Sequence, residues 1–138
     1  MAPIDVVKAV YATFAIGDMS TWKTYMSPDL VFKVAGNLPQ SGTFNGPEDV
    51  INNCFGPMAE HYPGISITPI QYWECGDTVF VECKSFSDNL PEEGLLEMHK
   101  IIVEREVCIS FQDYFDTEAA SAALVKDSEG AKSPGNAQ

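Results

Sequence analysis

The stretch EMHKIIVEREVCISFQDYFDT, residues 97–117, has the pattern of two β-strands joined by a tight turn. Successive residues of a strand point to opposite faces of a sheet, so every second residue shares a face. One face of the second strand is therefore predicted to carry Val107, Ile109, Phe111, Asp113 and Phe115. A carboxylate in an apolar row costs free energy unless it is paired or neutralised. Asp113 is for this reason the first candidate for a functional residue.

The first strand of this hairpin places a histidine where it can meet Asp113. If the turn lies near residues 104–105, one face of the strand carries Leu95, Glu97, His99, Ile101 and Val103. His99 then lies among apolar neighbours, within side-chain reach of Asp113 across the sheet. A His–Asp pair in an apolar cavity can transfer protons, because burial and mutual charge tune both pKa values. A structural buried pair, or a β-bulge that turns one side chain outward, explains the same pattern without catalysis.

The composition describes one domain and argues against several classes of partner. A chain of 138 residues, 45% hydrophobic and 20% charged, is typical of a globular domain with a sizeable core. The net charge of −12, without a basic stripe, argues against nucleic acid and anionic membranes as partners. The N-terminal residues show no secretory signal, and no window has the length of a transmembrane helix. We therefore expect a cytoplasmic protein.

The four cysteines, Cys54, Cys75, Cys83 and Cys108, lack the CxxC or Cys/His spacing of a metal site. Each lies in an apolar or strand-like context, which is typical of small buried residues in a reduced protein. Cys108 falls on the polar face of its strand in this pattern and has no visible base beside it. The sequence thus predicts neither a bound metal nor a thiolate nucleophile.

The order of secondary structure along the chain predicts an α+β fold. Helical patterns occupy residues 3–16, 18–26, 46–61 and 118–125, and strand patterns occupy residues 30–34, 65–74, 79–87, 95–103 and 107–115. This order indicates three N-terminal helices packed on a curved, mainly antiparallel sheet, with an apolar pocket between the layers. The predicted domain spans residues 1–127, and residues 128–138 are expected to form a disordered tail.

Several local motifs, in this order, resemble a known family. They are AIGD at residues 15–18, DLVFKVAG at 29–36, SGTFNGPE at 41–48 and QDYFDT at 112–117. Together they resemble the SnoaL-like proteins of the NTF2-like superfamily, over about residues 4–125. The resemblance implies a cone-shaped α+β fold around an internal pocket.

The same resemblance implies a site like that of the polyketide cyclases. In SnoaL-type cyclases an aspartate on the last strand serves as the acid/base, and a histidine on the preceding strand lines the pocket. Asp113 and His99 fall at the positions that look equivalent. We expect no metal or organic cofactor, because proton transfer next to a carbonyl can run on positioned acids and bases alone.

Related enzymes of the superfamily match less well. Val10 and Lys33 stand where ketosteroid isomerases have their tyrosine and aspartate. Arg105, the single arginine, lies at a turn and does not suit the Asp-Arg-Asp set of limonene-epoxide-hydrolase-like members. His61, at a helix end, is a poor match for the second histidine of a scytalone-dehydratase-like site.

The predicted function is that of a cofactor-free lyase, isomerase or cyclase acting on an apolar, carbonyl-bearing small molecule. Asp113 would move a proton, and His99 would orient it or polarise the substrate carbonyl. The expected substrate-binding wall consists of Tyr11, Trp22, Phe32, Phe55, Met58 and Phe111, a set that is also typical of plain core. A non-catalytic binder of an apolar molecule and a homodimeric interaction module remain open as alternatives.

The second face of the sheet favours a homodimer. It is expected to carry Tyr72, Phe80, Phe86 and Tyr114, which is more aromatic than a solvated face requires.

The remaining acidic residues have simpler interpretations. Asp116 is expected to cap the C-terminal helix. Asp88, Glu92, Glu93 and Glu97 form an acidic run that is interpreted as solvated surface.

Overall fold

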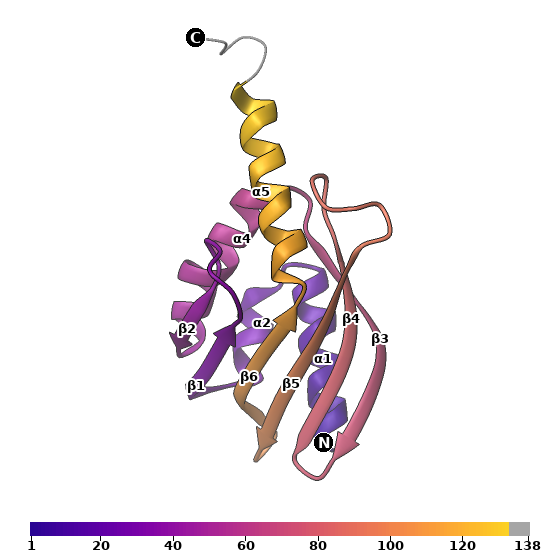
Figure 1. The fold of residues 1–138 in the computed structure, drawn as a ribbon. Helices are drawn as coiled ribbons and strands as arrows, with labels where there is room; N and C mark the ends of the chain where they lie inside the picture. The colour runs from indigo at the N-terminus through magenta and orange to yellow at the C-terminus, as the bar shows by residue number, and fades with distance from the viewer. Residues whose placement is uncertain (133–138) are drawn as a thin grey trace.

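One curved, unclosed sheet of six strands is the scaffold of the computed structural model, which describes residues 1–132 (Figure 1). The strands are β1 (Met26–Val34), β2 (Gly42–Asn45), β3 (Ser66–Cys75), β4 (Thr78–Phe86), β5 (Leu95–Glu104) and β6 (Val107–Phe115). Their order across the sheet is β2-β1-β6-β5-β4-β3. All neighbours are antiparallel except β1 and β6, which run parallel. The predicted α+β class with a mainly antiparallel sheet is confirmed.

The helices begin where the sequence supplies a suitable first turn. They are α1 (Pro3–Ala15), α2 (Met19–Thr24), the consecutive segments α3 (Pro47–Val50), η1 (Ile51–Phe55, a π-helical turn) and α4 (Gly56–His61), and finally α5 (Thr117–Lys132). Pro3 and Pro47 occupy first-turn positions, where a missing N–H is not needed. The Asp18 carboxylate accepts a hydrogen bond from the Thr21 N–H at 3.1 Å and caps α2. The third predicted helix is thus present, but as three segments.

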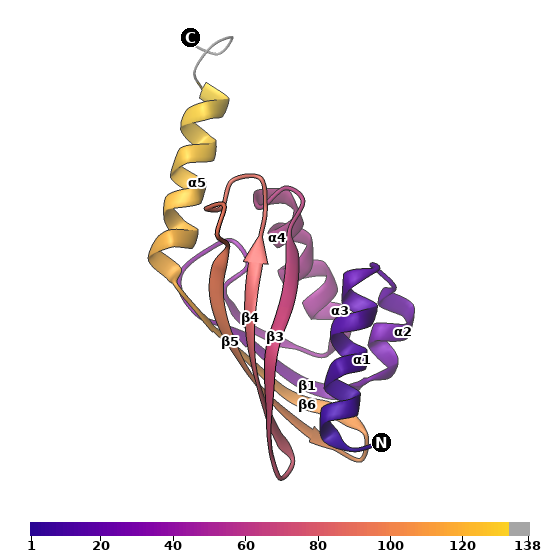
Figure 2. The same cartoon turned by 90° about the vertical axis from the view of Figure 1, so that its right-hand side faces the viewer.

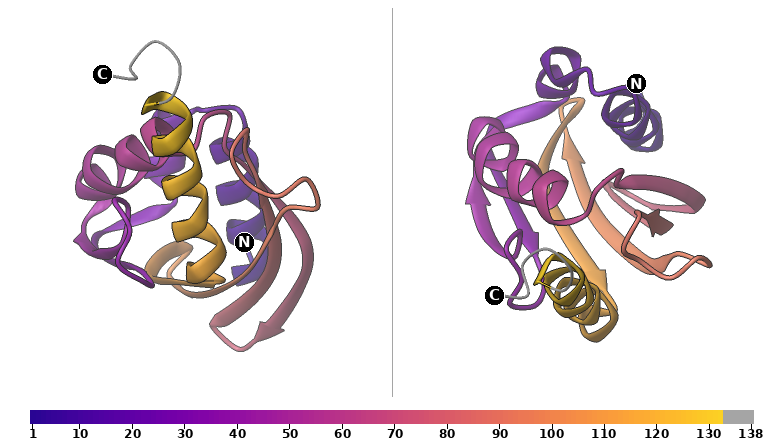
Figure 3. Two further views of the ribbon diagram at one scale, coloured as in Figure 1. Left: turned by 45° about the horizontal axis from the view of Figure 1, so that its top comes forward. Right: turned by 90° about the horizontal axis from the view of Figure 1, so that it is seen from above.

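The hydrophobic core lies between the concave face of the sheet and the N-terminal helices. Strand β4 shows the alternation clearly, because Val79, Val81 and Cys83 are fully buried while their neighbours are partly exposed. Helix α1 faces them with the fully buried Val6 and Val7. Figure 2 shows α1 and α2 beside the sheet, and the view from above in Figure 3 shows the strands curving around the segment of α3 and α4. The concave face is therefore both core and potential pocket wall.

The β5–β6 hairpin closes through a tight turn and contains a bulge. Arg105 and Glu106 both have positive φ, 52° and 65°, which a type I′ two-residue turn requires. Ile102 pairs with Ser110 and Val103 pairs with Cys108, so Ile109 is an extra residue without a partner. The bulge turns Cys108 into the core, where it is fully buried. The predicted placement of Cys108 on the polar face is wrong for this reason.

Two elements differ from the prediction in length or existence. Strand β2 was not predicted, because four residues are too few to show an alternating pattern. Helix α5 runs to Lys132, beyond the predicted end at residue 125. The Asp116 carboxylate accepts a hydrogen bond from the Ala119 N–H at 3.0 Å, which confirms Asp116 as the cap. The tail predicted at 128–138 falls in part outside the described residues.

No helix within residues 1–132 combines the length and the apolar character that crossing a membrane would require.

Candidate functional site

An apolar cavity of about 60 Å³ lies between the concave face of the sheet and the helices. All six side chains predicted for the substrate-binding wall lie on it, namely Tyr11, Trp22, Phe32, Phe55, Met58 and Phe111. The rings of Phe32 and Phe111 stack with centroids 4.4 Å apart, and Phe55 contacts Phe32 edge-on. A volume of this size holds several water molecules, because a single water needs about 10–15 Å³ on such a measure.

His99 and Asp113 meet at the wall of this cavity. They are directly paired across strands β5 and β6, and Nε2 of His99 lies 3.1 Å from Oδ1 of Asp113. His99 is buried, with 2% of its surface exposed. The contact predicted between these two side chains is therefore observed. The bulge at Ile109 sets this register, because the two-residue turn alone would place Gln112 opposite His99.

Glu97 completes the cluster from the same strand as His99. Its Oε1 lies 3.0 Å from Nε2 of His99, and its Oε2 accepts a hydrogen bond from the Ser85 hydroxyl. Only 7% of Glu97 is exposed, so its assignment to a solvated acidic run is wrong. Glu97 occupies the inward parity of β5, two residues before His99, and that parity was the signal for burial.

The other side of the imidazole faces helix α1. The Tyr11 hydroxyl lies 2.5 Å from Nδ1 of His99, and the two rings are parallel with centroids 5.8 Å apart. The Cys83 sulfur lies 3.6 Å from the same nitrogen. Both ring nitrogens of His99 are thus held by protein groups, Nδ1 by Tyr11 and Nε2 by Glu97.

Asp113 is left with an unpaired oxygen. Of the two carboxylates near Nε2 of His99, only Glu97 lies in the direction of the N–H. Oδ1 of Asp113 is buried and has no hydrogen-bond partner apart from its ionic contact with Nε2 of His99 at 3.1 Å. Buried polar atoms in proteins nearly always have a partner. Asp113 also lies on the wall of the cavity, so its carboxyl group is a candidate for proton exchange with a molecule bound there.

Burial and mutual charge shift the pKa values of all three groups. The pKa of Asp113 is raised to about 6. Burial is the largest cause of the rise, the positive charge of His99 opposes it, and the negative charge of Glu97 adds to it. For His99, burial opposes the charged form, yet the negative charge of Asp113 and the contact with Tyr11 hold its pKa well above the usual range. For Glu97, burial also opposes charge, but hydrogen bonds from His99 and Ser85 lower its pKa. We infer a His99 imidazolium paired with a Glu97 carboxylate, beside an Asp113 that titrates near neutral pH.

The same three side chains present the donor set of a metal site. One ligand atom each from Glu97, His99 and Asp113 lies within 4.8 Å of the others. Two carboxylates and an imidazole suit divalent zinc, manganese or iron. The sequence spacing did not indicate this set, because its ligands come from two strands and include no cysteine.

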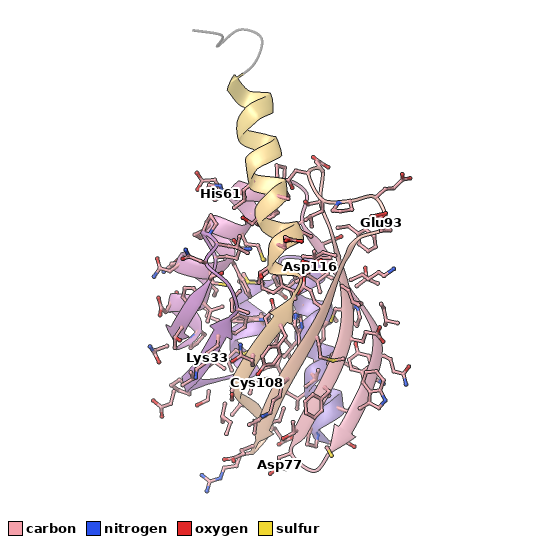
Figure 4. The ribbon with its side chains drawn as sticks, viewed as in Figure 1. Lys33, His61, Asp77, Glu93, Cys108 and Asp116 are labelled. Carbon is pink, nitrogen blue, oxygen red and sulfur yellow. The ribbon has the colours of Figure 1, made fainter. Side chains whose placement is uncertain are left out.

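Of the other residues considered from the sequence, His61, Lys33 and Arg105 lie outside the cavity. His61 ends α4 near the upper edge of the molecule, and Lys33 points from the exposed side of β1 (Figure 4). Arg105 lies in the β5–β6 turn, as predicted. Val10 lies on the cavity wall but offers no polar group.

The outer face of the sheet differs from the prediction in one residue. Tyr72 packs against the core, with its ring centroid 6.2 Å from that of Tyr11. A register shift between Pro69 and Gln71 reverses the alternation at this point of β3. Trp73, which pairs with Phe80, takes the outward position instead.

The sequence profile of the SnoaL-like domain family matches residues 7–92, more than half of the chain. The chain belongs to the SnoaL-like domain family. The matched segment ends before Glu97, so the family assignment rests on a different part of the chain from the polar cluster. No curated protein sequence gives a significant match.

Solved structures share the fold of this SnoaL-like domain. An NTF2-like protein from Burkholderia thailandensis E264 has a TM-score of 0.79 at 19% identity, covering 90% of this chain and 98% of that one. TerC, co-crystallized with polyporic acid, has a TM-score of 0.78 at 22% identity, covering 89% and 98%. A putative polyketide cyclase from Sinorhizobium meliloti has a TM-score of 0.68 at 13% identity, covering 80% and 94%. These likenesses establish the NTF2-like fold.

Proposed function

We propose that this SnoaL-like domain catalyses proton transfer on an apolar, carbonyl-bearing small molecule, as a cofactor-free lyase, isomerase or cyclase does. The observation that carries the proposal is the buried, unpaired Oδ1 of Asp113 on the wall of an apolar cavity. The large majority of buried carboxylate oxygens have a hydrogen-bond partner, so a buried oxygen without one points to a functional role.

Asp113 is the acid/base in this proposal. Its carboxylate removes a proton from the carbon next to the substrate carbonyl, which leaves an enolate, and the protonated carboxyl then returns the proton to another position. A pKa of about 6 suits both steps near neutral pH, because an acid/base works best when its pKa lies close to the working pH.

His99 is a positioning residue in this proposal. Both of its ring nitrogens are engaged, by Tyr11 and by Glu97, so neither is available to polarise a substrate carbonyl. Its positive charge lies next to Asp113 and moderates the rise in the Asp113 pKa. Glu97 in turn keeps His99 charged and oriented.

Two structural neighbours agree with a small organic ligand. One was co-crystallized with polyporic acid, and another is described as a putative polyketide cyclase. Their identities to this chain are low, so the argument rests on the residues of the cavity.

Hydrogen–deuterium exchange tests the proposal without knowledge of the natural substrate. The probe is 2-indanone, a small aromatic ketone, incubated in deuterated buffer containing EDTA. NMR then follows the loss of the protons next to the carbonyl. Catalysis predicts faster exchange with the protein than in buffer alone. A binder predicts that 2-indanone binds while its exchange rate stays at the buffer value, and this result would overturn the catalytic proposal.

We also propose that the outer sheet face forms a homodimer. Leu96 and Tyr114 lie on adjacent strands and expose 54% and 52% of their surface, with Met98 beside them and Trp73 farther along the face. The same face carries Glu82 and Lys100, so a two-fold related copy can offer the opposite charge. Light scattering at micromolar concentration should give twice the chain mass of 15.1 kDa. Met98→Glu should give the monomer mass, while Ile16→Glu, an exposed change at the end of α1, should not.

A further inference from the structure

A second buried oxygen without a partner lies in the same cavity as Asp113. Among the described side chains, two buried polar atoms have no hydrogen-bond partner, Oδ1 of Asp113 and Oε1 of Gln40. Gln40 is 6% exposed and contributes to the cavity wall. The mechanism proposed above does not use Gln40.

The loop between β1 and β2 holds Gln40 in place. The Ser41 hydroxyl donates to the Ala35 carbonyl at 2.7 Å and accepts from the Leu38 N–H at 3.0 Å. The Gln40 carbonyl accepts a hydrogen bond from the Cys54 thiol at 3.6 Å, which ties the loop to η1. Gly36 enters the loop at a φ of +89°, where a Cβ would meet Thr117 at 2.8 Å. The inward position of Gln40 is therefore built by several contacts.

Hydrogen bonding around Tyr62 decides which end of the Gln40 amide remains free. The Tyr62 hydroxyl donates its proton to the Ala120 carbonyl at 2.9 Å. Burial raises the pKa of Tyr62, and a hydrogen bond with Gln40 acts in the opposite direction. Because the hydroxyl proton is already used, Tyr62 offers no donor to Oε1 of Gln40. Oε1 of Gln40 is left as an acceptor in a water-poor, apolar environment.

We propose that Gln40 is a substrate-binding residue whose Oε1 accepts a hydrogen bond from a hydroxyl group of the ligand. The inference rests on the proposed function and narrows its substrate class. The ligand then carries a carbonyl near Asp113 and, elsewhere on the same apolar framework, a hydroxyl group that reaches Gln40. A site with a buried acceptor discriminates against analogues that lack the donor, because the acceptor stays unpaired in their complexes.

Phenol and fluorobenzene test this inference, since they have similar size and differ in the hydrogen-bond donor. Binding is measured in Asp113→Leu protein, which removes the other free acceptor. We expect phenol to bind roughly tenfold more tightly than fluorobenzene, the scale of one compensated buried acceptor. Adding Gln40→Met should abolish this preference, while adding Gln71→Met, an exposed glutamine on β3, should leave it intact. Equal affinities before Gln40 is changed, or a preference that survives Gln40→Met, would overturn the inference.

A second measurement does not depend on how the Gln40 variant folds. In ¹⁵N-labelled Asp113→Leu protein, the side-chain amide signals of Gln40 should shift on adding phenol and stay in place on adding fluorobenzene. Equal shifts with both probes contradict a hydrogen bond to Gln40. Failure here, together with intact exchange of 2-indanone by the wild-type protein, would remove the Gln40 proposal and leave the catalytic one standing.

Discussion

Oδ1 of Asp113 lies 3.1 Å from Nε2 of His99, yet the N–H of that nitrogen is directed at Glu97. The carboxylate is therefore close enough to feel the imidazolium charge without having its oxygen occupied. This arrangement explains how Asp113 can remain reactive at a buried position. It also separates the roles of the three residues, and each role can be tested by a different substitution.

Replacing His99 should change the pH dependence of the reaction rate more than the maximal rate. In His99→Gln the positive charge is lost, and the pKa of Asp113 should rise above its value of about 6. Because the base must be deprotonated, the acidic limb of the pH–rate profile should move to higher pH. At pH values well above that limb, His99→Gln should lose less of the wild-type rate than Asp113→Asn does. A profile with an unchanged limb would contradict the assigned coupling.

Replacing Glu97 should shift the same limb in the opposite direction. The Glu97 charge contributes to the raised pKa of Asp113, so Glu97→Gln should lower that pKa and extend activity to lower pH. Glu93→Gln is the matched control, because Glu93 lies in the exposed loop before β5 (Figure 4). An equal effect of both substitutions would point to long-range charge and not to the contact with His99.

The raised pKa of Asp113 also predicts how stability depends on pH. An unfolded aspartate titrates near 3.9, whereas Asp113 in the folded protein titrates at about 6. Between these pH values the folded state keeps a proton that the unfolded state has lost, so Asp113 increasingly destabilises the fold as pH rises. Near pH 7, the free energy of unfolding of Asp113→Asn should exceed that of the wild-type protein by on the order of 1–2 kcal/mol. Denaturant titration should show this as a higher midpoint concentration. The difference should vanish toward pH 4, and curves that stay parallel at all pH values would contradict the raised pKa.

The period of two along the last hairpin placed His99 and Asp113 on the same inward face. Both residues lie on the predicted inward parity, but their pairing needs the two-residue turn together with the bulge at Ile109. The turn itself has no glycine, so its positive φ values at Arg105 and Glu106 could not be read from residue type. The bulge at Ile109 was also hidden, because a bulge depends on how two strands twist together. The bulge reverses the predicted faces of Val107 and Cys108, and it brings Asp113 opposite His99, where the turn alone would place Gln112.

The other site residues needed the tertiary structure. Glu97 had the correct parity, but its charge and its acidic neighbours favoured a surface interpretation. Its burial is tolerated because His99 and Ser85 form hydrogen bonds with its carboxylate in the folded protein. Gln40 lies in a loop, where no periodicity indicates direction. Its inward position depends on contacts with Cys54 and Tyr62, which are distant in the chain.

Asp113→Asn in the 2-indanone exchange assay tests the central claim most directly. Asparagine keeps the size of the side chain and removes the titrating proton, so the loss should appear in the rate and not in binding. We expect exchange to fall by about 10² to 10⁴, the usual scale for removing one general acid or base, with the affinity for 2-indanone nearly unchanged. Asp29→Asn, an exposed change on β1, should exchange as fast as the wild-type protein. Exchange that is equally fast in Asp113→Asn and in wild-type protein would contradict the assignment of Asp113 as the acid/base.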